Sequence, residues 1–166
     1  MKLQDLDIII TSPPPPGWGG RYWILVKVTT DTGVVGWGEC YASSVGPDAM
    51  RAVIKDVFER HMQDENPENI ELMFRRVYSS GFTQRPDLTV MGAFSGLEIA
   101  CWDILGKDRD RPVYALLGGL MNERIRAYTY LYPLPDQNMN DFWLSPEMTA
   151  RAAADYVNQG YTALKF

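Results

Sequence analysis

Residues 93–107 read AFSGLEIACWDILGK, and this stretch decides the fold. It belongs to a longer run over 89–107 that predicts one long helix. Small residues recur inside the run at Gly92, Gly96 and Ala100, which lets the helix backbone approach a neighbouring element. We therefore expect other elements to pack closely against this helix.

The residues before the helix predict a small sheet and two further helices. β-branched and aromatic residues fill 22–30, a turn follows at 31–33, and 34–40 returns, so that with 2–10 they predict three antiparallel strands. A proline- and glycine-rich loop over 13–20 separates the first two strands. Helices are expected from Pro47 and from 66–68. The residues expected to face inward on the second of these are Ile70, Met73, Phe74 and Val77.

The pattern changes after Gly119, where strands and helices begin to alternate. Residues 124–131 predict a strand, and 161–166 predict another. Between them, Ser145-Pro146-Glu147 forms a strong helix start, with a capping serine and a proline in the first turn. A strand–helix–strand unit of this spacing predicts two parallel strands.

Two motifs outside the long helix complete a family resemblance. Gly36-Trp37-Gly38-Glu39 lies in the predicted hairpin, and the last predicted strand reads YTALKF over 161–166. With AFSGLEIACWDILGK, these motifs make the chain resemble the mandelate racemase/muconate lactonizing enzyme branch of the enolase superfamily. The resemblance covers essentially the whole chain in the right order. Cys101 departs from the signature, which has Ala or Leu at that position.

The resemblance implies a two-part architecture and a metal-dependent chemistry. Residues 1–122 would form an α+β capping domain, a three-stranded antiparallel sheet with helices, and 123–166 would form the first βαβ unit of a truncated β/α barrel of the TIM type. Members of the family remove the proton α to a carboxylate and stabilise the enediolate on Mg²⁺. The usual metal ligands end the third, fourth and fifth barrel strands, so they would lie beyond Phe166.

Lys165 is the residue to which the resemblance gives a catalytic role. It ends the second barrel strand, on the face where barrel active sites lie, and it matches the first Lys of the family's Lys-x-Lys motif. That lysine supports the substrate carboxylate, and the second motif position would be residue 167. Without the resemblance, a solvated lysine at a strand end would be the simpler interpretation. Tyr130 and Tyr132 end the first barrel strand, and one of them is expected to touch substrate.

The capping domain contributes candidate substrate-binding residues from two loops. Trp18 and Arg21 belong to the loop that resembles the family's mobile cap loop, as an aromatic wall and a carboxylate-binding guanidinium. Tyr41 and Ser43 match the second specificity loop and could bind hydroxyl groups. The alternatives are simple packing for Trp18 and a surface position for Arg21.

Other reactive residue types have structural interpretations. His61 stands at the end of a predicted helix, Glu98 and Asp103 lie on the long helix with Lys107 as a candidate ion-pair partner, and Glu39 belongs to the hairpin. Cys40 and Cys101 are expected to be buried free thiols, which favours a reducing, cytoplasmic compartment; a disulfide is the alternative.

Composition limits the classes of partner. A net charge of −5 without a basic run argues against nucleic acid, and no apolar stretch approaches the roughly 20 residues that span a bilayer. The resemblance instead implies a sugar acid as substrate, Mg²⁺ as cofactor and a homo-oligomer.

The sequence thus favours an Mg²⁺-dependent acid-sugar dehydratase that is active in a full-length parent protein. A racemase, epimerase or cycloisomerase of the same superfamily is the alternative among enzymes. The chain as it stands could also be a non-catalytic fragment or an interaction module, since the expected metal ligands fall outside it.

Overall fold

The structure, a computed structural model, describes residues 1–14, 20–41 and 44–166. The described residues form two compact units, Met1–Gly119 and Leu120–Phe166. Each unit has a hydrophobic core of its own.

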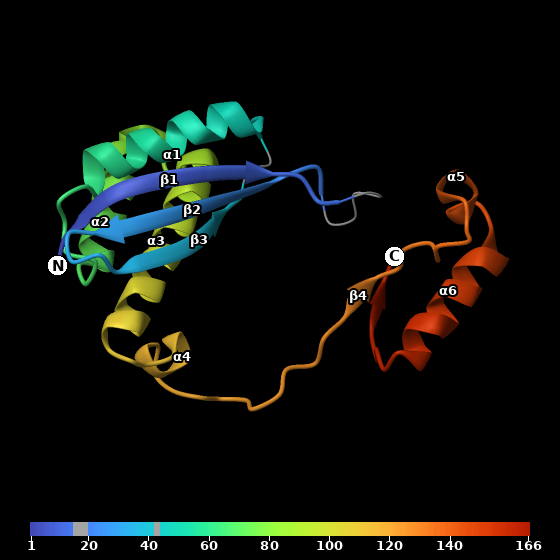
Figure 1. Cartoon of the computed structure of the whole chain (residues 1–166). Helices are drawn as coiled ribbons and strands as arrows, with labels where there is room; N and C mark the ends of the chain where they lie inside the picture. The colour runs from blue at the N-terminus through green and yellow to red at the C-terminus, as the bar shows by residue number, and fades with distance from the viewer. Residues whose placement is uncertain (15–19, 42–43) are drawn as a thin grey trace. The chain divides into compact units, whose positions relative to one another are not determined.

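A three-stranded antiparallel sheet organises the first unit, as the sequence predicts. Strands β1 (Leu3–Thr11), β2 (Trp23–Thr30) and β3 (Val35–Cys40) lie side by side in that order (Figure 1). Along β2 buried residues alternate with more exposed ones, because successive side chains of a strand point to opposite faces. Helices α1 (Pro47–His61) and α3 (Leu88–Asp108) pack on the inward face, and α2 (Ile70–Ser80) packs against these two helices.

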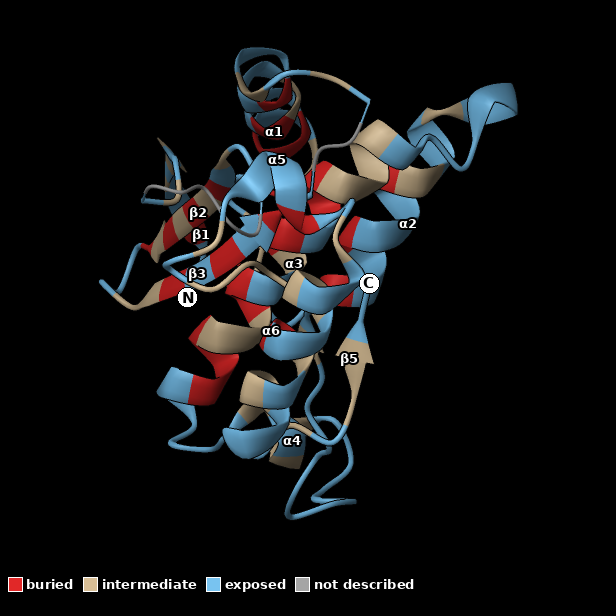
Figure 2. Ribbon diagram, turned by 90° about the vertical axis from the view of Figure 1, so that its right-hand side faces the viewer, coloured by how far each residue is buried: buried red, intermediate tan, exposed pale blue. Residues whose placement is uncertain are grey.

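Helix α3 is the central element of this unit, and Figure 2 shows buried residues along its length. It begins after Asp87, whose carboxylate accepts hydrogen bonds from the backbone N–H groups of Thr89 and Val90 at 2.9 and 3.1 Å. This side chain satisfies donors that a helix start leaves unpaired, so α3 starts one residue earlier than predicted.

Glycines let α3 lie directly on β3. A Cβ atom at Gly38 would stand 1.9 Å from the carbonyl oxygen of Gly96, and one at Gly36 would stand 2.1 Å from that of Ala100. These contacts are between two backbones, so no side-chain rearrangement could relieve them. The close packing expected of the long helix is therefore confirmed. It also requires the hairpin glycines Gly36 and Gly38, which leave room for the helix backbone.

The expectation that no apolar stretch approaches the length of a membrane span is wrong for α3. By length and composition alone, its 21 residues suffice to cross a bilayer, and among the described residues it is the one such helix. Its apolar residues include Phe94, Leu97 and Ile104, which are buried against the sheet and the neighbouring helices. Packing inside the first unit thus accounts for these buried apolar residues, whereas Leu88 and Ile99 of the same helix are exposed.

Helix α2 departs from its predicted form. It begins at Ile70 because the side chain of Asn66 accepts a hydrogen bond from the backbone of Glu68 at 3.0 Å and closes a turn there. Phe74 is 37% exposed and not fully inward as expected, and its ring packs beside Tyr78 and the buried Phe94.

Short helices flank α3 at both ends. The segment between α2 and α3 contains a 3₁₀ turn, η1 (Phe82–Gln84). The short helix α4 (Val113–Leu116) ends before Gly118 and Gly119, whose positive φ angles of 114° and 110° suit residues without a Cβ atom.

The second unit is a strand–helix–strand unit with two parallel strands, as predicted. Strands β4 (Thr129–Tyr130) and β5 (Leu164–Lys165) pair with Tyr130 opposite Lys165. Both are much shorter than the predicted 124–131 and 161–166, because the ladder hydrogen bonds are confined to this stretch. Between them lie α5 (Met139–Phe142), which was not predicted from the sequence, and α6 (Pro146–Asn158), capped by Ser145 as expected. Leu131, Phe142 and Ala152 form the core.

Candidate functional site

Lys165 is held by a tyrosine of the neighbouring strand. Its Nζ atom donates a hydrogen bond to Oη of Tyr130 at 2.8 Å and lies 4.6 Å from the centre of the same ring. The hydrogen bond to the Tyr130 hydroxyl raises the pKa of the exposed Lys165 side chain. Electrostatic attraction to Tyr130 and then to Tyr128 raises this pKa further. Lys165 is therefore a stable ammonium group at neutral pH, suited to binding a carboxylate and not to accepting a proton.

Three tyrosines form a row on the same face as Lys165. The ring centres of Tyr128 and Tyr130 are 6.2 Å apart, and those of Tyr130 and Tyr132 are 6.0 Å apart. Leu131 points the other way and is buried with Phe142 of α5. The two faces of β4 are thus distinct: one carries the small core, and the other presents aromatic rings and the ammonium group.

The first unit carries a separate hollow at the start of β2 and the end of β3. Its cavity volume is about 310 Å³, and it brings together Arg21 and Tyr41, which the sequence analysis placed in two different loops. Trp18 and Ser43, the other two candidates from those loops, lie outside the described residues. The full lining is Gly20, Arg21, Tyr22, Trp23, Ile24, Glu39, Cys40 and Tyr41.

The polar groups of this hollow are mixed in charge. Arg21 supplies a guanidinium, Tyr41 is 75% exposed and offers a phenol, and Glu39 adds a carboxylate that was expected to be only structural. The hydroxyl of Tyr22 donates to the carbonyl of Val45 at 3.3 Å and so ties the start of β2 to the segment after the second loop. The hollow can therefore offer hydrogen bonds to both hydroxyl and carboxylate groups.

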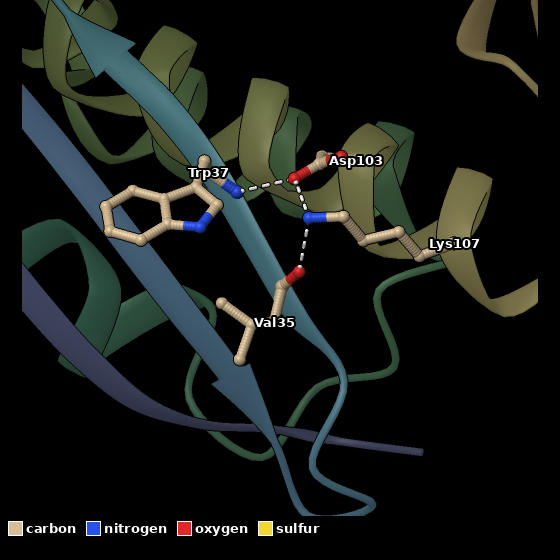
Figure 3. A network of polar contacts seen from close by, with 4 residues as sticks. All are labelled: Val35, Trp37, Asp103 and Lys107. Atoms are coloured by element: carbon tan, nitrogen blue, oxygen red, sulfur yellow. Dashed lines mark hydrogen bonds and ion pairs between the residues drawn. The ribbon is translucent and has the colours of Figure 1, made fainter.

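The charges on α3 are structural, as the sequence analysis expected (Figure 3). The carboxylate of Asp103 accepts hydrogen bonds from the backbone N–H of Trp37 at 2.8 Å and from the Lys107 ammonium at 2.6 Å. Lys107 also donates to the carbonyl oxygen of Val35 at 2.8 Å. Since β3 is an edge strand, this pair occupies backbone groups that would otherwise be open to another strand. Glu98 accepts a hydrogen bond from the indole of Trp102 at 3.3 Å.

The remaining titratable candidates do not gather into a reactive centre. Burial, followed by the neighbouring Arg60, lowers the pKa of His61, and the two side chains lie 3.2 Å apart at the end of α1. Both cysteines are free and buried, and burial raises the pKa of each thiol to about 12. Over residues 1–14, 20–41 and 44–166, no three His, Cys, Asp or Glu side chains are placed to hold a metal ion.

Comparisons with known proteins agree on one family. The family model described as the N-terminal domain of mandelate racemase/muconate lactonizing enzyme matches residues 19–118. A D-gluconate/D-galactonate dehydratase of Picrophilus torridus is 35% identical over 158 residues, which are 91% of this chain and 37% of that protein. A D-galactonate dehydratase family member of Streptomyces bingchenggensis is 33% identical over 77% of this chain and 29% of its own length.

A solved structure shares the entire fold. The mandelate racemase/muconate lactonizing enzyme from a Sulfitobacter species superposes with a TM-score of 0.97 and is 81% identical. The match covers 100% of this chain and 42% of that structure. The chain therefore spans well under half the length of the relatives it matches.

Proposed function

The chain belongs to the mandelate racemase/muconate lactonizing enzyme family of the enolase superfamily, and on this basis we propose that its full-length protein is an Mg²⁺-dependent acid-sugar dehydratase. The observation that carries the proposal is the Lys165 ammonium group, held at the end of a parallel strand beside Tyr130. The dehydratase names of two relatives support the reaction.

Lys165 would assist the removal of a very weakly acidic proton. The proton α to a carboxylate leaves more easily when the negative charge that develops on the carboxylate meets a fixed cation. The raised pKa of Lys165 keeps its ammonium charged, so the residue fits this electrostatic role. Mg²⁺ would supply further positive charge when bound. The described residues of this chain do not form its site, and we propose that the ligands lie in later barrel strands.

The hollow at the start of β2 is the proposed contribution of the capping domain. Arg21 would pair with a second carboxylate or a hydroxyl group of the substrate, and Tyr41 would bind hydroxyl groups. Trp18 and Ser43 remain candidates for the same role. We further propose that the full-length protein is a cytoplasmic homo-oligomer, and the two free, buried thiols support a reducing compartment.

A screen of aldonates and aldarates with the full-length protein and Mg²⁺ tests this proposal. We expect one or a few of these acids to lose water, seen by mass spectrometry as a keto-deoxy product. Replacing Lys165→Ala should lower kcat by about 10²–10³-fold, because it removes a charge that acts on the reacting group. Lys27→Ala is the matched control, since Lys27 forms an exposed ion pair with Asp7 on the sheet and should leave kcat unchanged.

The same screen distinguishes the other reactions of the superfamily. Incubation in D₂O that places deuterium at the α carbon without loss of water would identify a racemase or epimerase. Full turnover by the Lys165→Ala variant would remove the basis for any role of this lysine in the reaction.

A further inference from the structure

The acceptor that Lys165 uses is a phenol hydroxyl from the adjacent strand, and this pairing is fixed by the backbone. The N–H of Thr129 donates to the carbonyl of Ala163 at 3.3 Å, and that of Leu131 donates to the carbonyl of Lys165 at 2.8 Å. These two bonds bracket Tyr130 and set it opposite Lys165, so both side chains leave the ladder on the same face.

We propose that Tyr130 is a positioning residue, whose hydroxyl orients the Lys165 ammonium toward the substrate carboxylate. The role rests on the proposed function, because it assigns a task within the same site. The sequence-based expectation is that Tyr130 or Tyr132 touches substrate. In the role proposed here, Tyr130 instead acts on the substrate through Lys165.

The surroundings of Tyr130 suit this task. Lysine has a long, flexible side chain, and an exposed one ordinarily samples many conformations. Here the ammonium group has both a hydroxyl at 2.8 Å and the face of the same ring at 4.6 Å. The Tyr130 ring is in turn flanked by the rings of Tyr128 and Tyr132. The tyrosine row thus restricts Tyr130, and Tyr130 restricts Lys165.

The hydrogen bond also has a consequence for protonation. A hydroxyl that accepts a bond from the ammonium favours the charged form, so the Tyr130 hydroxyl raises the pKa of Lys165. Among the described residues, the titratable groups that act on Lys165 are Tyr130 of β4, the strand paired with β5, and Tyr128, which lies just before β4. The remaining ammonium protons are available to a substrate carboxylate.

The test compares Tyr130→Phe with Tyr128→Phe in the full-length protein. Both variants lose one phenol hydroxyl from the same row of tyrosines, but only the first loses the acceptor of Lys165. We expect Tyr130→Phe to lower kcat/KM by about tenfold, which is typical for a lost hydrogen bond to a charged group. The alkaline limb of its pH profile should move to lower pH. Tyr128→Phe keeps its ring and removes a hydroxyl that does not bind Lys165, so it should change kcat/KM and the alkaline limb much less than Tyr130→Phe does.

A second readout does not depend on catalysis. Competitive labelling with acetic anhydride across pH, followed by mass spectrometry of the peptide that carries Lys165, measures the pKa of this lysine directly. In the folded wild type that pKa should exceed its value in the same protein unfolded by guanidinium, and Tyr130→Phe should lower it. An unchanged pKa in Tyr130→Phe, or a wild-type pKa equal to the unfolded value, would overturn the proposal. If no sugar acid is turned over, the labelling still decides whether Tyr130 controls Lys165.

Discussion

Burial determines the chemistry of the two cysteines. Cys40 and Cys101 are 3% and 0% exposed, and burial raises the pKa of each thiol to about 12. The thiolate is the reactive form, so both residues are inert in the folded protein despite their nucleophilic type. The expectation of buried free thiols is confirmed.

Alkylation by iodoacetamide near pH 8 should therefore be at least about 100-fold slower in the folded protein than in guanidinium. The raised thiol pKa values also predict how the free energy of unfolding changes with pH. Because the thiol pKa values are raised in the folded state, the folded state retains protons that the unfolded state releases near pH 9. The stabilisation is complete below that pH, and the free energy of unfolding should decrease as pH rises above it. Fast labelling of the native protein at both cysteines would contradict this.

The candidate site shows what single residues reveal in a sequence. Lys165 could be proposed from the sequence because it stands at a strand end in a motif that resembles the family's, and its role stays a prediction. Its contact with Tyr130 depends on the register of a parallel pair, which residue types alone do not specify. Glu39 was expected to be structural, and it also lines the hollow with Arg21 and Tyr41, because β3 ends beside the start of β2.

At the scale of elements, the packing of α3 on β3 depends on backbone contact. Gly38→Ala would place a methyl group 1.9 Å from the Gly96 carbonyl oxygen, so we expect a loss of about 3 kcal/mol or more in the free energy of unfolding. Gly46→Ala is the control: Gly46 has open space around its Cβ position and precedes α1 as its N-cap. It should cost less than about 1 kcal/mol. Denaturant titrations of both variants measure the free energy of unfolding. Equal losses of this free energy would show that α3 does not lie tightly against β3.

Asp103 has a second element-scale role, at the open edge of β3. Asp103→Ala removes the acceptor of the Trp37 N–H and the partner of Lys107, and should cost about 1–2 kcal/mol. It should also increase aggregation, because a freed strand edge can pair with another chain. Asp56→Ala removes an equally spaced helical ion pair, with Arg60, from an exposed face and should cost at most about 0.5 kcal/mol. Thermal unfolding and light scattering report the two effects. Similar behaviour of both variants would argue against an edge-protecting pair.

Element types were easier to predict than element ends. The three strands of the first unit and its long helix follow from alternating and helical patterns that burial enforces. The start of α2 and the first turn of α3 depend on single side chains, Asn66 and Asp87, that bind the local backbone. These side-chain hydrogen bonds to the local backbone determine where a helix begins, but they hardly change the spacing of hydrophobic residues from which helices are predicted.

At the scale of the whole molecule, the two units differ greatly in the size of their cores. The first buries residues from three strands and three helices around α3, whereas the second has Leu131, Phe142 and Ala152 as its fully buried apolar residues. Small cores confer little stability, so local opening should be frequent in the second unit. The predicted boundary between domains at residues 122 and 123 stays a prediction about the full-length protein.

Hydrogen exchange on the 166-residue polypeptide should resolve this difference. We expect amides of β4, β5 and α6 to exchange on the order of 100-fold faster than those in the middle of α3, because less apolar area is exposed when the second unit opens. Mass spectrometry of peptic peptides separates the two regions. Equal protection in both would mean that the units unfold together.

The backbone contact between β3 and α3 also has a consequence for genome mining. Gly36 and Gly38 are required by the closeness of a helix, and neither residue contacts Lys165 or lines the Arg21 hollow. A search built on the hairpin glycines and the long helix will therefore collect chains that share this architecture, whatever their substrates. Sorting such a collection by reaction requires a separate filter, placed on the strands that carry Tyr130 and Lys165 and on those that follow them.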